Sequence, residues 1–503
     1  MPKYTRLPVT REWIRRCGAV MLAPLALCWA SPALAAGNYA PPGLYDVRYL
    51  TLENGLDVVL KKRTHAHNVA VRLVVDVGHR YFGCDKRETT HFLEHLLFTG
   101  TSRYSEAELD RLIEDHGGSW NAATSETETE YQIDIFDSYL PLAIETLHEI
   151  ITDTVITPAK IEQTREIIRQ ELGGKTSALR RWLYRRGIGK SALTKSREAL
   201  LPGTGIVCPG LDTPANIAEG DVKQAYRDYY VPNNMSMIIV GNFDETAVLR
   251  QITDTFGRMA TSNATTHNLT TPPYPDQARE VSGTFSPLLG SNAAVGVAYR
   301  TDGLGSPDLY ALWVLYVYLD RALYERIRVA EGLSYSPEAM YNWDVDYGLF
   351  AAVADAELGK LDVVGAMIDE EIDKLRRGPP DSDELENAKR RILLARVQGY
   401  ESNAGVASYY VRNLHELSIH GRLLDHETAI ANLTPSDIQR VVSKYLREDR
   451  QVALRSVPTL TYTQFFTLLI ITVTGIAALG VYAYWRVARG RRAHAAQRSS
   501  GAG

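Results

Sequence analysis

Cysteine is scarce in this sequence. The 503 residues include four cysteines, and two of them, Cys17 and Cys28, lie in an N-terminal segment that reads as a secretory signal. Neither of the others, Cys84 and Cys208, is placed like a catalytic nucleophile, so both are expected to be structural. Two cysteines in an oxidising compartment can pair, and the sequence leaves open whether these two do.

The central part of the chain also lacks an excess of basic residues. The formal net charge of −5 averages unlike parts. Residues 1–35 hold five Lys or Arg and one Glu, and residues 486–503 hold five Arg and no acid, so the body between them carries −14. An acidic body argues against a nucleic-acid-binding protein.

Long apolar runs are rare as well. Residues 465–485 contain no charged residue and are long enough to cross a bilayer as a helix. Aromatic residues at the end of this run, among them Trp485, are typical of a membrane interface. The basic residues 486–503 follow directly, so the positive-inside rule predicts a cytoplasmic tail.

The N-terminus has the features of a signal peptide, predicted over residues 1–36. A basic start, a short apolar stretch from Gly18 to Ala30 and the small residues Ala33-Leu34-Ala35 fit this interpretation. An uncleaved anchor is the alternative. Together with the C-terminal run, the signal predicts a single-pass protein of the bacterial inner membrane with its body in the periplasm. A eukaryotic secretory route is the other possibility.

The chemistry centres on His91-Phe92-Leu93-Glu94-His95. The segment lies in an apolar run up to Phe98 that is expected to be helical. Residues four apart share a helix face, so His91 and His95 would point the same way with Glu94 beside them. Two imidazoles and a carboxylate suit a divalent metal such as zinc. Taken alone, the pattern also fits a helix with two half-exposed histidines.

A catalytic zinc usually takes three protein ligands. Glu171 lies 76 residues after His95 in a second helical stretch. With this spacing, and with the segments 98–101 and 121–125, residues 45–457 resemble the M16 family of metallopeptidases, which includes pitrilysin and the mitochondrial processing peptidase and carries the inverzincin order H-x-x-E-H. The resemblance implies that His91, His95 and Glu171 bind one Zn²⁺ per chain and that Glu94 is the general base.

The resemblance also implies the fold. We expect an α+β protein with two homologous domains, each an antiparallel sheet with helices packed on one side, that form a clamshell, followed by a C-terminal transmembrane helix. The first domain, residues 45–255, would carry the zinc site, 256–280 would be a linker, and 281–457 the second domain. The second half has no H-x-x-E-H, so only the first would perform metal chemistry.

Residues 120–136 read as one long strand. In the resembled family such a strand is an exposed edge that pairs with the substrate main chain. The predicted substrate-binding residues are Asn121, Ala122, Ala123 and Thr124. Three acidic residues would alternate onto one face of the strand, either as a solvated face or as a wall that favours basic peptides: Glu126, Glu128 and Glu130.

The second half contributes one motif. Residues 328–336 resemble the R-x-x-x-G-L-x-Y-S segment of the family, in which the Arg and the Tyr reach the substrate and the developing oxyanion. The resemblance therefore implies catalytic roles for Arg328 and Tyr335, which carry hydrogen-bond donors suited to a tetrahedral oxygen. Without the resemblance, a surface Arg and a core Tyr would be the simpler interpretation.

The predicted function is a zinc-dependent endopeptidase that hydrolyses peptides or unfolded segments in the periplasm, with a homodimer or an M16-like partner chain as possible assemblies. The alternative is a non-catalytic M16-like scaffold or binding subunit of a membrane complex. A zinc hydrolase of another fold is a third reading. One departure bears on these choices: many relatives have a glutamate seven residues before the ligand, where this chain has Thr164, so zinc is held more weakly or another group compensates.

Overall fold

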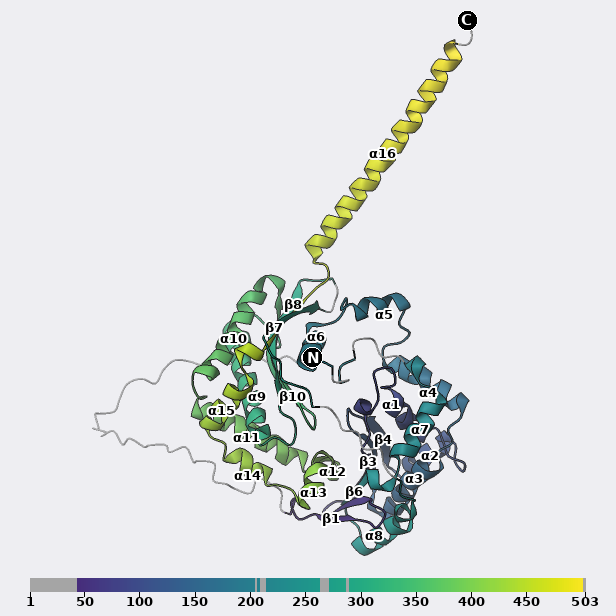
Figure 1. The fold of residues 1–503 in the computed structure, drawn as a ribbon, viewed down its shortest axis with the longest axis vertical. Coiled ribbons are helices and arrows are strands. Elements are labelled where there is room, and N and C mark those ends of the chain that lie inside the picture. The colour runs from purple at the N-terminus through teal and green to yellow at the C-terminus, as the bar shows by residue number, and fades with distance from the viewer. Residues whose placement is uncertain (1–42, 204–205, 209–213, 263–270, 286–288, 501–503) are drawn as a thin grey trace, which may run out of the picture.

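The computed structural model describes residues 43–203, 206–208, 214–262, 271–285 and 289–500. The predicted signal peptide lies outside these residues. Figure 1 shows two α+β halves side by side and a long C-terminal helix that leaves one edge of the body. The prediction of an α+β fold with two sheet-containing halves is confirmed.

The first half is built on a six-stranded sheet in the order β1-β2-β6-β3-β5-β4. The central strand β3 is rich in β-branched residues and is buried on both faces, which explains why it reads as a strand in the sequence. The β2–β6 pair is parallel and the other pairs are antiparallel. The strands are β1 Arg48–Thr51, β2 Asp57–Lys62, β3 Asn68–Val75, β4 Ser119–Thr124, β5 Thr129–Phe136 and β6 Met235–Gly241.

The helices of the first half lie mainly on one face of this sheet and enclose its core. They are α1 Thr89–Phe98, α2 Glu106–Glu114, α3 Leu140–Asp153, α4 Pro158–Glu171, α5 Ala178–Arg185, α6 Ala192–Leu200, α7 Glu219–Tyr229 and α8 Glu245–Asp254. The short 3₁₀ helices are η1 His79–Tyr81, η2 Asp137–Tyr139, η3 Pro214–Asn216, η4 Pro232–Asn234 and η5 Phe256–Arg258.

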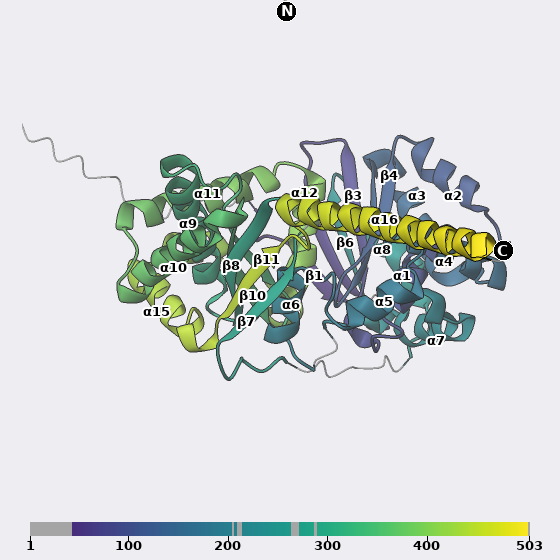
Figure 2. The ribbon, with the colours of Figure 1, turned by 90° about the horizontal axis from the view of Figure 1, so that it is seen from above.

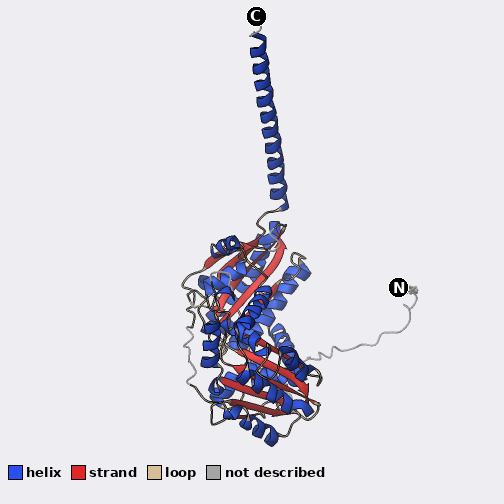
Figure 3. Ribbon diagram, turned by 90° about the vertical axis from the view of Figure 1, so that its right-hand side faces the viewer, coloured by secondary structure: helices blue, strands red, loops and turns tan. Residues whose placement is uncertain are grey.

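The second half repeats this plan around a five-stranded sheet in the order β7-β11-β8-β10-β9, with one parallel pair, β7–β11. The two sheets are visible as separate groups of strands in Figure 3. The strands are β7 Arg279–Thr284, β8 Asn292–Thr301, β9 Glu338–Trp343, β10 Gly348–Glu357 and β11 Val452–Val457. The helices are α9 Leu309–Leu323, the π-helix η6 Tyr324–Ala330, η7 Leu358–Lys360, α10 Leu361–Arg377, α11 Ser382–Gly399, α12 Asn403–Arg412, α13 Leu414–His420, α14 His426–Ala431, α15 Pro435–Tyr445 and η8 Glu448–Arg450.

One helix from each half packs on the sheet of the other half. Helix α12 of the second half covers the outer face of the first sheet, where Val406 and Tyr410 pack with Ile238. Helix α6 of the first half covers the second sheet in the same way, and the backbone N–H of Ala192 donates to Ser456 Oγ of β11 at 3.0 Å. Both faces of each sheet are therefore covered, one of them by the partner half.

The predicted long strand over residues 120–136 is wrong. The segment forms a hairpin of β4 and β5, because Ser125 Oγ accepts hydrogen bonds from the backbone N–H groups of Thr127 and Glu128 at 3.2 and 3.0 Å and turns the chain. Glu128 therefore lies in the turn with Glu126, and the predicted alternation of three acidic residues on one strand face does not form.

The C-terminal run forms helix α16, Tyr462–Ser500. Residues 462–490 are long and apolar enough to cross a membrane, and none of the most apolar window is buried against the body. Figures 1 and 3 show this helix extending away from the two halves, and in Figure 2 it is seen from above, in front of them. The structure thus contains the candidate transmembrane helix that the sequence predicted.

Candidate metal centre

Helix α1 presents the H-x-x-E-H motif on one face. Its apolar residues Phe92, Leu93, Leu96 and Leu97 are fully buried in the core of the first half. This burial fixes the rotation of the helix and leaves the two histidines only partly covered, with 18 % and 23 % of their side chains exposed. The expected pairing across one helical turn is found, because the Nε2 atoms of the two histidines lie 3.2 Å apart.

Helix α4 brings Glu171 to the histidines. The helix begins after Thr157, whose hydroxyl caps it, and packs on α1 through Ile161 and Ile168. It ends at Glu171, and Gly173 continues with a positive φ of 87°, which only glycine adopts without strain. The carboxylate of Glu171 is therefore at a helix end, with 45 % of its side chain exposed.

The three side chains form a nearly regular triangle. Glu171 Oε2 lies 3.2 Å from His91 Nε2 and 3.3 Å from His95 Nε2. A tetrahedral zinc with bonds of about 2.0–2.1 Å holds its ligand atoms about 3.3–3.4 Å apart. The donor set and its spacing thus match one triangular face of a zinc tetrahedron, whose fourth corner is left for water or substrate.

Glu88 supports this site and was not recognised in the sequence. It is 5 % exposed, and its Oε2 lies 2.9 Å from His91 Nδ1. Burial alone would raise the pKa of Glu88, but the hydrogen bond from His91 and the charges of His79 and Arg87 lower it. Glu88 is therefore a carboxylate that can accept the Nδ1 proton, which turns His91 Nε2 toward the metal position. Its place three residues before His91 on a helical segment was the available signal.

The electrostatics of the triangle favour a cation. Burial would lower the pKa of His91, but the hydrogen bond to Glu88 and the charges of Glu94 and Glu171 raise it. Three carboxylates thus surround two imidazoles. This balance suits a bound divalent cation.

Glu94 is held from the sheet. Thr124 Oγ1, at the end of β4, donates a hydrogen bond to Glu94 Oε2 at 2.5 Å. β4 is also the edge strand of the first sheet, so one of its sides has no partner strand. Asn121 and Ala123 are exposed along it, and Ala122 is half-buried. A peptide added to this edge would run past Glu94 toward the metal position.

Arg328 and Tyr335 are close to each other. Arg328 lies on the π-helix η6 and donates from Nη1 to the carbonyl of Tyr335 at 2.5 Å, with its guanidinium 4.4 Å from the Tyr335 ring centre. Tyr335 is 74 % exposed and is not the core residue of the simpler interpretation. Among the described residues, no hydrogen bond or ion pair joins either side chain to the histidines or to Glu171.

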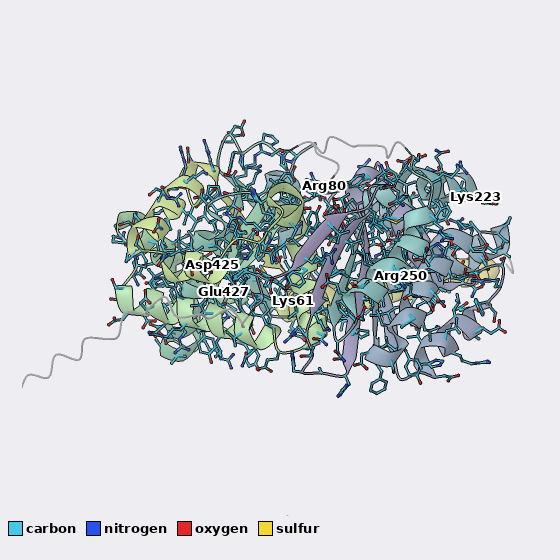
Figure 4. All side chains as sticks on the ribbon, turned by 90° about the horizontal axis from the view of Figure 1, so that it is seen from below. Lys61, Arg80, Lys223, Arg250, Asp425 and Glu427 are labelled. Atoms are coloured by element: carbon cyan, nitrogen blue, oxygen red, sulfur yellow. A yellow bond between two sulfur atoms is a disulfide. The ribbon has the colours of Figure 1, made fainter. Side chains whose placement is uncertain are left out.

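The segment before α1 is tied down on two sides. Cys84 and Cys208 form a disulfide, which answers the question that the sequence left open. Arg80 forms an ion pair of 2.7 Å with Asp346 of the second half, and Figure 4 shows it at the boundary between the halves. These links fix the segment that carries Glu88 relative to both halves.

Thr164 occupies the position where many relatives have a second glutamate. It is fully buried on α4, and its hydroxyl has no hydrogen-bond partner among the described residues. The side chain contributes nothing to the ligand set. The carboxylate that does contact a ligand comes instead from Glu88.

Comparisons with known proteins agree with this geometry. The model of the family described as "Insulinase (Peptidase family M16)" matches residues 57–193, and that of the "Peptidase M16 inactive domain" matches residues 216–392. A probable mitochondrial-processing peptidase subunit beta of Arabidopsis thaliana is 25 % identical over 85 % of this chain and 81 % of its own length. An uncharacterized zinc protease of Streptomyces coelicolor is 24 % identical over 80 % and 88 %.

Solved structures support the same fold. A protease from Helicobacter pylori superposes with a TM-score of 0.70 at 20 % identity, covering 82 % of this chain and 99 % of that one. The periplasmic protease PqqL from Escherichia coli gives a TM-score of 0.66 at 18 % identity, covering 82 % of this chain and 47 % of that one.

Proposed function

Because the chain belongs to peptidase family M16, we propose that it is a zinc-dependent endopeptidase that cleaves peptides or unfolded protein segments. The observation that carries this proposal is the triangle of His91, His95 and Glu171, with edges of 3.2–3.3 Å. Zinc bound there supplies Lewis acidity that activates water and polarises a peptide carbonyl.

Other residues of the chain have separate roles in the proposed reaction. Glu94 accepts a proton from the attacking water and returns it to the leaving amine. Thr124 holds the carboxylate of Glu94 through its hydrogen bond. The free edge of β4, residues 119–124, aligns the substrate by main-chain hydrogen bonds, which tolerates many side chains.

Arg328 and Tyr335 complete the proposed site as donors to the developing oxyanion. Their mutual contact already pairs the two groups. Within the described part of the chain, no hydrogen bond or ion pair joins them to His91, His95 or Glu171, so this role requires the substrate to bridge the two halves. A loss of kcat with unchanged zinc binding in Arg328→Ala is the expected signature.

The proposal includes the cellular location and membrane topology of the protein. Helix α16 anchors the protein in the bacterial inner membrane, with the catalytic halves in the periplasm and residues 486–503 in the cytoplasm. The disulfide between Cys84 and Cys208 supports an oxidising compartment for the body, because such bonds persist there. Whether the protein acts with a second copy or an M16-like partner chain stays an expectation.

The non-catalytic scaffold is the competing function, and Thr164 is the residue in its favour. Cleavage assays of the full chain in detergent separate the two. We expect the wild type to cut an unfolded reporter peptide and to spare the same sequence within a folded protein. Glu94→Gln should abolish cleavage while Glu114→Gln, an exposed change on α2, leaves it intact. If the cleavage assays give the same result for the wild type and for Glu94→Gln, the scaffold function would be supported.

A further inference from the structure

Helix α5, Ala178–Arg185, has no buried side chain. Leu179 and Trp182, one turn apart, are 65 % and 50 % exposed, and Leu183 continues the same apolar stripe. Arg180 and Arg185 flank this stripe on its two sides, and both are exposed. A helix with an exposed apolar stripe flanked by exposed arginines has the pattern of an interfacial membrane helix.

The segment around α5 is basic in an otherwise acidic body. Residues 172–197 contain eight Lys or Arg and no Asp or Glu. Among the described residues, none of the arginines at positions 180, 181, 185 and 186 forms an ion pair. Their charges are therefore available to an anionic partner.

Contacts on the polar side of α5 turn the apolar stripe outward. The Lys190 ammonium lies 4.9 Å from the ring centre of Tyr184, and the Lys190 side chain is itself buried and paired with Glu198 of α6. Arg186 lies over the Trp182 ring at 4.3 Å. Since Tyr184 faces the body, Leu179 and Trp182 face away from it.

The chain places α5 beside the start of α16. The carbonyl of Lys190 accepts a hydrogen bond of 2.8 Å from Thr284 at the end of β7, and Thr284 pairs with Val457 at the end of β11. The connections from Arg185 to Lys190 and from Val457 to α16 are each short enough to span at most about 18 Å. Figure 1 shows α5 on the side of the body from which α16 leaves.

We propose that α5 lies on the surface of the membrane that α16 crosses, with Leu179 and Trp182 in the headgroup region and the arginines on anionic phospholipid. Apolar burial and attraction to anionic lipid together stabilise such helices. Tryptophan is also typical of membrane interfaces. The position of the segment on the side of the body from which α16 leaves favours lipid over a second copy of the chain.

One consequence concerns substrates and rests on the proposed function. Glu171 is seven residues before Ala178, a distance of at most about 25 Å along an extended chain. With α5 on the lipid, the metal centre would be held near the membrane surface. Polypeptide segments that leave the bilayer are then the favoured substrate class.

Brominated lipids test the proposal without an activity assay. The full chain is reconstituted in nanodiscs of phosphatidylcholine and phosphatidylglycerol, with and without bromine on the acyl chains. Tryptophan emission is compared for wild type, Trp182→Phe and Trp485→Phe, so that the contribution of each residue is obtained by difference. We expect bromine to quench Trp182, and to quench Trp485 as the marker of α16.

Two leucine substitutions, one on α5 and one control, test the same proposal through the quenching of Trp182. Leu179→Gln should reduce the quenching of Trp182, whereas Leu394→Gln, at the similarly exposed Leu394 of α11 (58 % against 65 %), should not change it. Unquenched Trp182 emission would overturn the proposal. In that result, quenched Trp485 would show that α16 is inserted and α5 alone is misassigned, and an intact peptidase activity would show that the proposed function survives.

Discussion

The carboxylate of Glu88 lies 2.9 Å from Nδ1 of His91, on the side of the imidazole that faces away from the other ligands. A carboxylate in this position fixes which nitrogen of a metal-binding histidine carries the proton. The chain therefore has a supporting carboxylate for the proposed metal centre although Thr164 replaces the one found in many relatives.

Glu88→Gln should weaken zinc binding by about 10- to 100-fold, the usual effect of losing such a partner. The amide can still fill the space, so the fold should persist. Competition with a zinc chelator measures the affinity, and Glu114→Gln serves as an exposed control on α2. An unchanged affinity in Glu88→Gln would show that the contact does not support the metal.

Thr124→Ala should lower kcat while the zinc content stays that of the wild type. The substitution removes one hydrogen bond to the charged Glu94, which corresponds to about a ten- to hundredfold loss. Thr124→Ser keeps the hydroxyl and should restore most of the rate. If Ser and Ala behave alike, the hydroxyl does not position Glu94.

Glu128 predicts a pH effect on stability. Burial, and then the charges of Asp76, Glu130 and Asp344, raise its pKa from 4.5 to about 7. The folded state therefore binds more protons than the unfolded state between these values, so the free energy of unfolding falls as pH rises through this window.

Glu128→Gln removes this titration. The variant should be more stable than wild type by about 1–3 kcal/mol at pH 8 and no more stable at pH 4. Urea unfolding at several pH values measures the difference, with Glu357→Gln as an exposed control. A difference that does not depend on pH would mean that Glu128 titrates normally.

The disulfide predicts a stability effect of a different kind. Cys84 and Cys208 are 124 residues apart in the chain, so the bond restricts a large loop in the unfolded state. Cys84→Ser with Cys208→Ser should lower the free energy of unfolding by about 2–4 kcal/mol. Reduction of the wild type should reproduce the loss and should leave the double variant unaffected. A wild type insensitive to reductant would contradict this prediction.

The sequence contained the local parts of the site. The two histidines and Glu94 depend on helical periodicity within one turn, which is a short-range property, and the buried Phe92 and Leu93 confirm it. Glu171 required the resemblance to a family, because helical spacing says nothing about a contact 76 residues away.

The sequence did not predict the contacts between segments that are far apart in the chain. Only the fold shows that α6, residues 192–200, packs on the sheet of the other half. The turn at Ser125 was missed because residues 125–128 contain no Gly, Pro, Asn or Asp, and the strand-like residues on both sides continue the pattern.

Zinc content of the purified full chain tests the central claim most directly. We predict about one zinc per chain in the wild type and in Glu94→Gln, with peptide cleavage in the wild type alone, and loss of tightly bound zinc in Glu171→Gln. A wild type that binds no zinc after metal is supplied, and cuts no peptide, would contradict the peptidase account and leave the scaffold in its place.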